Sequence, residues 1–133
     1  MASGADAVIL DLEDSIAPER KAQARAAALE FLKAAATKKQ RPRLLVRING
    51  LDIGMTDADL DAVVAGKPDA ILFPKAEGGA SVTHLDAKLT AREAIAGLPE
   101  GSIKILAQAV ESAVGLFLAG TFRDSSNRLI GLT

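Results

Sequence analysis

The chain has 133 residues, and its 16 Lys and Arg against 17 Asp and Glu give a net charge of −1. No basic stripe is present, so a nucleic-acid partner is not expected. Cysteine is absent, which excludes disulfides, thiolate metal sites and cysteine nucleophiles. The first apolar run, residues 7–10, is too short for a signal peptide or a membrane span. We therefore expect a cytoplasmic protein with no membrane partner.

Five short apolar runs recur along the chain and predict strands. Most are continuous rather than alternating, which is typical of strands buried on both faces of a parallel sheet. They comprise residues 7–10, 44–48, 70–73, 103–110 and 129–132.

Segments with helical periodicity separate the first four runs from the runs that follow them. We predict helices over residues 18–36, from Thr56 to about Gly66, over 81–96 and over 114–119. Pro18 suits a first helical turn, and Thr56 with Asp59 could form a capping box. Strand and helix thus alternate along the whole chain, which predicts an α/β fold of parallel βαβ units in one domain, residues 1–133.

Polar residues follow each of the first four predicted strands. In a parallel α/β fold the carboxyl ends of the strands meet at one edge, where binding sites form. We therefore expect these side chains to share one edge of the sheet. They are Asp11, Glu13 and Asp14, then Arg47 and Asn49, then Lys75 and Glu77, and finally Glu111.

This set of residue types favours a particular chemistry. Carboxylates without histidine or cysteine suit a hard cation such as Mg²⁺, and an arginine fork binds a carboxylate in bidentate fashion. A metal ion beside Arg47 would suit a 2-keto acid, since the ion could also stabilise developing negative charge on oxygen.

Four motifs resemble the HpcH/HpaI aldolase and citrate lyase β-subunit family in their order and spacing. They are GADAVILDLEDSIAPERKAQAR, LLVRING, FPKAE and VESAVG. The resemblance implies a TIM barrel and Mg²⁺-dependent cleavage or formation of a C–C bond in a carboxylated hydroxyacyl-CoA. Citryl-CoA, malyl-CoA and citramalyl-CoA are typical substrates, with oxaloacetate, glyoxylate or pyruvate and an acyl-CoA as the cleavage products.

The resemblance also implies roles for individual residues. Glu111 matches a metal-binding acid, and Arg47 matches the arginine that holds the keto-acid carboxylate. Glu13 and Asp14 match acids that bind the waters of the metal ion. Lys75 matches a recurrent lysine at the same edge, and the Asn49 amide could steady Arg47, so both are candidate substrate-binding residues. Relatives of this kind form trimers or hexamers, so a homo-oligomer is expected.

The resemblance implies an upstream strand and a second metal-binding aspartate that the 133 residues do not contain. About five strands of a barrel that needs about 250 residues are present. We therefore expect a partial barrel whose activity depends on further chain. The alternative hypotheses are a non-catalytic module that binds a small acid or assembles through its open sheet edges, and an inactive fragment.

Alternative interpretations apply to single residues as well. Arg47 could pair internally with Asp11 or Glu13, and Lys75 with Glu13 or Glu77. The only histidine, His84, is expected to be a solvated surface residue. Gly78-Gly79 could be a turn or could approach a phosphate group.

Overall fold

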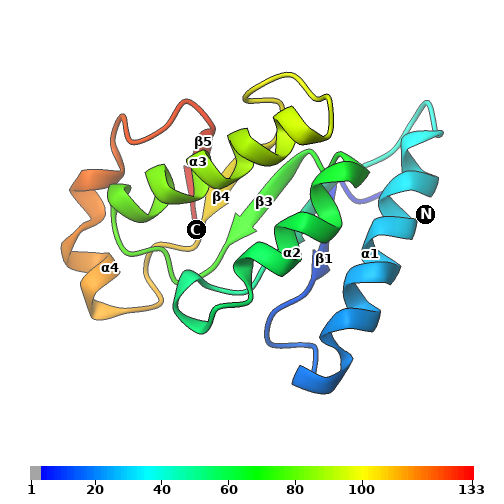
Figure 1. Ribbon diagram of the computed structural model, residues 1–133. Coiled ribbons are helices and arrows are strands. Elements are labelled where there is room, and N and C mark those ends of the chain that lie inside the picture. The colour runs from blue at the N-terminus through cyan, green and yellow to red at the C-terminus, as the bar shows by residue number, and fades with distance from the viewer. Residues whose placement is uncertain (1–3) are drawn as a thin grey trace.

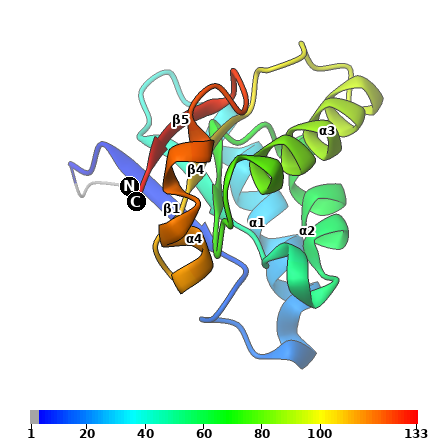
Figure 2. The ribbon, with the colours of Figure 1, turned by 90° about the vertical axis from the view of Figure 1, so that its left-hand side faces the viewer.

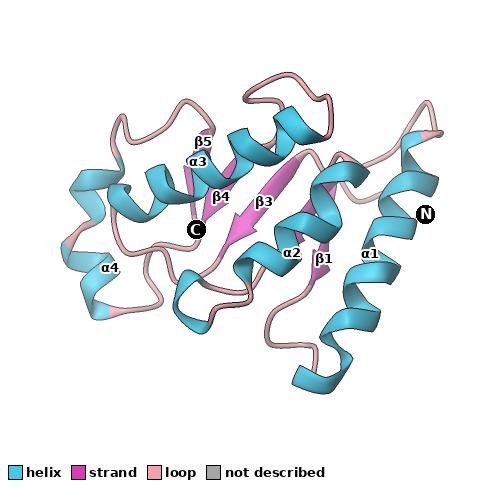
Figure 3. Ribbon diagram, in the orientation of Figure 1, coloured by secondary structure: helices cyan, strands magenta, loops and turns pink. Residues whose placement is uncertain are grey.

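The computed structural model describes residues 4–133 and shows five strands alternating with helices. The strands form one parallel sheet in chain order (Figures 1 and 3). They are β1 (Ala7–Asp11), β2 (Arg43–Arg47), β3 (Ala70–Phe73), β4 (Lys104–Ala107) and β5 (Leu129–Leu132). The helices are α1 (Lys21–Ala36), α2 (Thr56–Val63), α3 (Gly79–Ile95) and α4 (Ala113–Phe117). The predicted α/β fold of parallel βαβ units is confirmed.

Most predicted element boundaries lie close to those of the structure, but the strand predicted over residues 103–110 is shorter, because β4 ends at Ala107. Residues 70–73 and 129–132 are strands as predicted, and the first predicted helix is a 3₁₀ turn, Pro18–Arg20, that runs directly into α1. The fourth predicted helix is α4 followed by the 3₁₀ turn Ala119–Phe122. Residues 1–3 lie outside the described part. No helix within residues 4–133 is long and apolar enough to cross a membrane.

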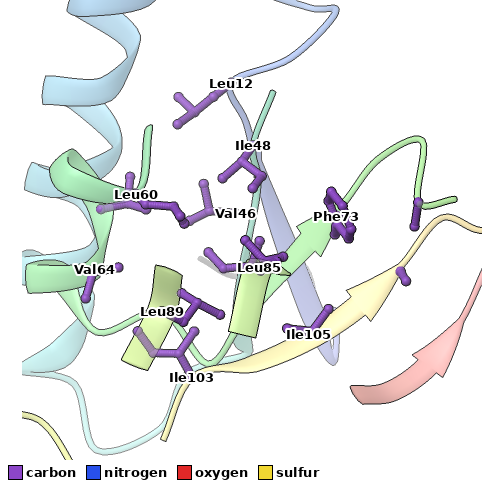
Figure 4. Packing of buried hydrophobic residues seen from close by; sticks show 14 of the residues in the cluster. Leu12, Val46, Ile48, Leu60, Val64, Phe73, Leu85, Leu89, Ile103 and Ile105 are labelled. Carbon is purple, nitrogen blue, oxygen red and sulfur yellow. The ribbon is translucent and has the colours of Figure 1, made fainter. Parts of the chain in front are cut away.

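The hydrophobic core lies between the sheet and the helices α1, α2 and α3, which cover the same face (Figure 2). From the strands, Val46, Phe73 and Ile105 are fully buried against this layer (Figure 4). From the helices, Leu60 and Leu89 meet them with no exposed surface. Each such side chain contributes about 1.5–3 kcal/mol by leaving water, so this layer supplies the main driving force for the fold.

The opposite face of the sheet has no helix across it in residues 4–133 (Figure 2). All four residues of β3 are buried, as its continuous apolar run predicted. The edge strands differ, because Ile9 in β1 is 52% exposed and Ile130 in β5 is 60% exposed. Burial on both faces therefore holds at the centre of the sheet and fails at its edges.

The predicted capping box at the start of α2 is wrong, although the helix does begin at Thr56. The Thr56 hydroxyl donates to the carbonyl oxygens of Asn49 and Gly50, at 3.1 and 2.8 Å. The Asp59 carboxylate accepts a hydrogen bond from the main-chain N–H of Asn49 at 2.7 Å instead of capping the helix. The loop after β2 offers these groups partners, and tertiary hydrogen bonds replace the local ones.

Candidate functional site at the carboxyl edge of the sheet

The polar residues that follow β1, β2, β3 and β4 lie at one edge of the sheet, because the strands are parallel and in register. Ion pairs join the loop after β1 to Arg47 in β2 and to Lys75 after β3. A hydrogen bond then joins Lys75 to Glu111 after β4. Four consecutive strand ends thus contribute to one connected cluster.

Arg47 is gripped by the aspartate opposite it in the sheet. Asp11 and Arg47 are register partners, and the Arg47 Nε and Nη2 groups donate to the two Asp11 carboxylate oxygens at 2.8 and 2.5 Å. These hydrogen bonds, with the nearby charges of Asp11 and Glu13, raise the pKa of Arg47. The guanidinium is permanently charged and held in one orientation, and its side chain remains 22% exposed.

The Glu13 carboxylate lies between two cations without a well-aligned hydrogen bond. Its side chain is 3% exposed, and its two oxygens are each 3.3 Å from one nitrogen, one from Arg47 Nη1 and the other from Lys75 Nζ. Neither oxygen accepts a hydrogen bond within the described part of the chain. Buried carboxylate oxygens normally have such partners, so Glu13 retains accepting capacity toward a bound group.

Lys75 contacts Glu13 and Glu111 in two different ways. Its Nζ faces Glu13, and its main-chain N–H donates to Glu111 Oε2 at 2.6 Å. The contact with Glu13 raises the pKa of Lys75, which keeps the ammonium charged. Lys75 also has a φ of 50°, in the left-handed region that non-glycine residues rarely adopt. Such backbone conformations concentrate at functional sites.

Asp14 lies at the surface of the site, whereas Asn49 is buried. Asp14 is exposed, and its charge acts on both Arg47 and Lys75. Asn49 is 1% exposed, and its side-chain amide donates to the Leu12 carbonyl and to Asp59. The Asn49 amide is therefore used inside the protein, below the exposed surface of the site.

Two open clefts flank the cluster. One, of about 480 Å³, is lined by residues that include Lys75, Glu77 and Glu111. The other, of about 470 Å³, lies on the uncovered face of the sheet and is lined by residues that include Asp11 and Arg47. Both are large enough for a small carboxylic acid, and each presents at least one cation.

The remaining predicted residues are explained by packing. His84 is exposed, as expected, and Gly79 lies where a Cβ atom would come within 2.1 Å of the Thr121 carbonyl oxygen. The Gly79 N–H donates to the Thr121 hydroxyl at 2.9 Å. Close approach to Thr121 therefore accounts for this glycine without a phosphate. Glu77 accepts from Ser112 at 2.9 Å, rather than pairing with Lys75.

The donor set suits a divalent cation. Asp11, Glu13, Asp14 and Glu111 bring four carboxylates to this edge, against the cations of Arg47 and Lys75. No group of three or more metal-binding side chains converges within residues 4–133. Mg²⁺ commonly needs only one or two protein carboxylates and keeps several waters, and the buried Glu13 oxygens, which accept no hydrogen bond within the described residues, would be available to those waters.

Asp11 should make the stability of the fold sensitive to acid. Burial disfavours its ionised form, but hydrogen bonds from Arg47, Ser15 and the Glu13 amide outweigh this and hold the pKa of Asp11 well below its usual 3.8. Because the pKa of Asp11 is lower in the folded than in the unfolded state, the ionised carboxylate stabilises the fold at pH values above the usual pKa of 3.8. This stabilisation is lost as the pH falls toward the lower pKa of the folded state. Chemical denaturation of Asp11→Asn should show a flatter loss of stability between about pH 5 and 2 than wild type. If the unfolding free energies of wild type and Asp11→Asn fell equally steeply with falling pH, this assignment would be contradicted.

The chain is similar to known proteins over its whole length. The family model described as HpcH/HpaI aldolase/citrate lyase matches residues 1–133. The citrate lyase subunit beta of Leuconostoc mesenteroides subsp. cremoris is 36% identical over 129 residues, which cover 97% of this chain and 42% of that protein. An L-malyl-CoA/beta-methylmalyl-CoA lyase of Cereibacter sphaeroides is 39% identical, covering 96% of this chain and 40% of that protein.

Among solved structures, protein CitE from Mycobacterium tuberculosis in complex with magnesium and acetoacetate matches with a TM-score of 0.68 and 31% identity. The match covers 96% of this chain and 44% of that one. A malate synthase from Haloferax volcanii shares the fold, with a TM-score of 0.77 at 21% identity. The chain thus spans less than half the length of these relatives.

Proposed function

Because the chain belongs to the HpcH/HpaI aldolase/citrate lyase family, we propose that its protein is a carbon–carbon lyase or aldolase. The proposed reaction interconverts a carboxylated hydroxyacyl-CoA, of the citryl-, malyl- or citramalyl-CoA type, with a 2-keto acid and an acyl-CoA. One observation carries the proposal: at the carboxyl edge of the sheet the Arg47 guanidinium lies beside the buried Glu13 carboxylate, whose oxygens accept no hydrogen bond within the described residues.

Each residue of the cluster has a proposed role. Arg47 binds the keto-acid carboxylate through guanidinium N–H groups, in competition with Asp11, which occupies two of them. Glu111 would bind Mg²⁺, and Glu13 and Asp14 would accept hydrogen bonds from its waters. Lys75 faces the substrate from the neighbouring cleft. Asn49 contributes to substrate binding from below, through the loop that follows Arg47.

The chain's own residues orient and neutralise the substrate. Arg47 fixes the carboxylate, so that the keto group points to the acidic cluster, and its charge does not depend on pH. When bound, Mg²⁺ supplies positive charge against the oxygen on which negative charge develops. The structure of CitE from M. tuberculosis in complex with magnesium and acetoacetate supports a site that takes both a magnesium ion and a small acid.

We further propose that residues 1–133 are one domain that forms part of an eight-stranded barrel in the longer protein. The relatives that match 96–97% of this chain are more than twice its length, which supports this proposal. A homo-oligomer and a cytoplasmic location stay predictions.

Calorimetry on the full-length protein tests the proposed site. Oxaloacetate, glyoxylate or pyruvate should bind only with Mg²⁺ present, and Glu111→Gln should weaken that binding at least about tenfold, because the metal loses a ligand. Glu100→Gln is the matched control, since Glu100 is exposed and precedes β4 at the opposite edge. Mg²⁺-independent binding, or equal effects of the two variants, would contradict the metal role. Tight binding without any turnover would favour the alternative of a non-catalytic acid-binding module.

A further inference from the structure

We propose that Lys21 is a positioning residue of this site, which holds the main chain at Glu13 and so sets where the Glu13 carboxylate stands between Arg47 and Lys75. This inference rests on the proposed function. Lys21 is the first residue of α1 and is only 8% exposed, an unusual position for a lysine. Its ammonium points back beneath the loop that follows β1 and donates to that loop.

All three donors of the Lys21 ammonium are used inside the protein. Nζ donates to the Leu12 carbonyl at 2.6 Å, to the Glu13 carbonyl at 2.7 Å and to Asn49 Oδ1 at 2.8 Å. A lysine ammonium has three N–H groups, so none remains for a substrate. Lys21 therefore acts through the groups it holds, and it does not act on the reacting atoms.

The position of Lys21 is not explained by helix stability. The first turn of a helix favours acidic residues, because the free N–H groups there carry partial positive charge. Lys21 forms no ion pair in the described part of the chain, since its three acceptors are neutral oxygens. A buried cation with neutral partners is costly. We infer that this cost is retained because the ammonium orders two consecutive carbonyls, those of Leu12 and Glu13.

Further buried residues connect the contacts of Lys21 to the loop after the next strand, β2. The Asn49 side chain accepts from Lys21 and donates to the same Leu12 carbonyl at 3.0 Å and to Asp59 at 2.6 Å. Asp59 is fully buried and is held by Arg25 at 2.7 Å. The loops after β1 and β2 are thus locked to each other, which fixes Glu13 relative to Arg47.

Two substitutions in the full-length protein test the role of Lys21. Lys21→Met should lower kcat and the affinity for Mg²⁺ by about 10–100-fold each, the usual effect of losing a group that orients a metal-site residue. The KM for the acyl-CoA should change little, because Lys21 is buried and all three of its donors are used inside the protein. Lys21→Arg, which keeps a charged donor, should recover part of both losses. Mg²⁺ affinity is measured by calorimetry, separately from turnover.

Lys88→Met is the matched control. Lys88 lies on α3 and pairs with exposed Asp57 at 2.8 Å, and neither residue lines the two clefts beside the cluster, so its loss should leave kcat and Mg²⁺ affinity unchanged. A Lys21→Met protein that is less stable but has wild-type kcat and Mg²⁺ affinity would overturn the proposal. If Lys21→Met does not fold, Lys21→Gln replaces it, with wild-type values again overturning the proposal. The proposed function fails separately, if Arg47→Ala leaves turnover intact.

Discussion

Arg47→Ala should lower the turnover of the keto-acid reaction by on the order of 10³-fold, as expected when a preorganised charged donor is removed from a site. The loss has two sources. The substrate carboxylate loses its binding partner, and Asp11 and Glu13 are left as neighbouring carboxylates without the cation between them. Steady-state kinetics of the full-length protein with excess Mg²⁺ measure this loss.

Two further variants sharpen the Arg47 test. Arg47→Lys should stay at least about tenfold impaired, because a single ammonium cannot reproduce the two-pronged contact with a carboxylate. Arg43→Ala is the control, since Arg43 is on the same strand but its side chain is 78% exposed and pairs with Asp69 at the other end of the sheet. Wild-type turnover in Arg47→Ala would refute the assignment of this residue.

Arg128→Met should destabilise the fold by about 3–5 kcal/mol, the range expected when one partner of a buried ion pair is removed. Arg128 is 2% exposed and Glu93 is fully buried. The guanidinium donates to Glu93 at 2.9 Å and to the Ile103 carbonyl at 3.1 Å, and it also pairs with Asp86. Without the Arg128 guanidinium, the buried carboxylate of Glu93 would lose the cation that neutralises it. Chemical denaturation measures the loss of unfolding free energy.

Arg92→Met is the matched control for Arg128→Met. Arg92 neighbours Glu93 on α3, but it pairs with exposed Asp57 and Asp61, whose side chains are 57 and 67% accessible. Exposed ion pairs contribute only about 0–1 kcal/mol, so this variant should remain near wild type. Adding Glu93→Gln to Arg128→Met should recover part of the stability. An equal loss of unfolding free energy in the two arginine variants would show that the buried network stabilises the fold no more than the exposed ion pairs do.

Local sequence patterns predicted most of the fold because burial on one face leaves a periodic trace. Residues 70–73 became β3 and residues 129–132 became β5 without a shift. The helix of residues 81–96 was displaced by only two residues at its start and one at its end. Local rules failed where a tertiary hydrogen-bond partner was available. Thr56 and Asp59 form hydrogen bonds with the loop after β2 and do not cap the first turn of α2.

The candidate site was foreseeable in its membership and not in its internal contacts. Charged residues after buried strands indicated the edge on which Glu13, Arg47, Lys75 and Glu111 gather. The strand register decided that Asp11 occupies the Arg47 fork. Lys21 was visible only as part of a motif, because a lysine at a helix start carries no local sign of the carbonyl groups that it will meet.

By itself, the order of apolar runs and polar strand ends determined the parallel α/β fold and which residues stand at its carboxyl edge, since both follow from burial along one chain. Only the tertiary structure decided which of these charges neutralise one another and which stay open. The Glu13 oxygens lie near two cations and accept no hydrogen bond within the described residues, whereas both Asp11 oxygens accept from Arg47. That difference depends on strand register and loop backbone over distances of a few ångströms, which no local pattern specifies.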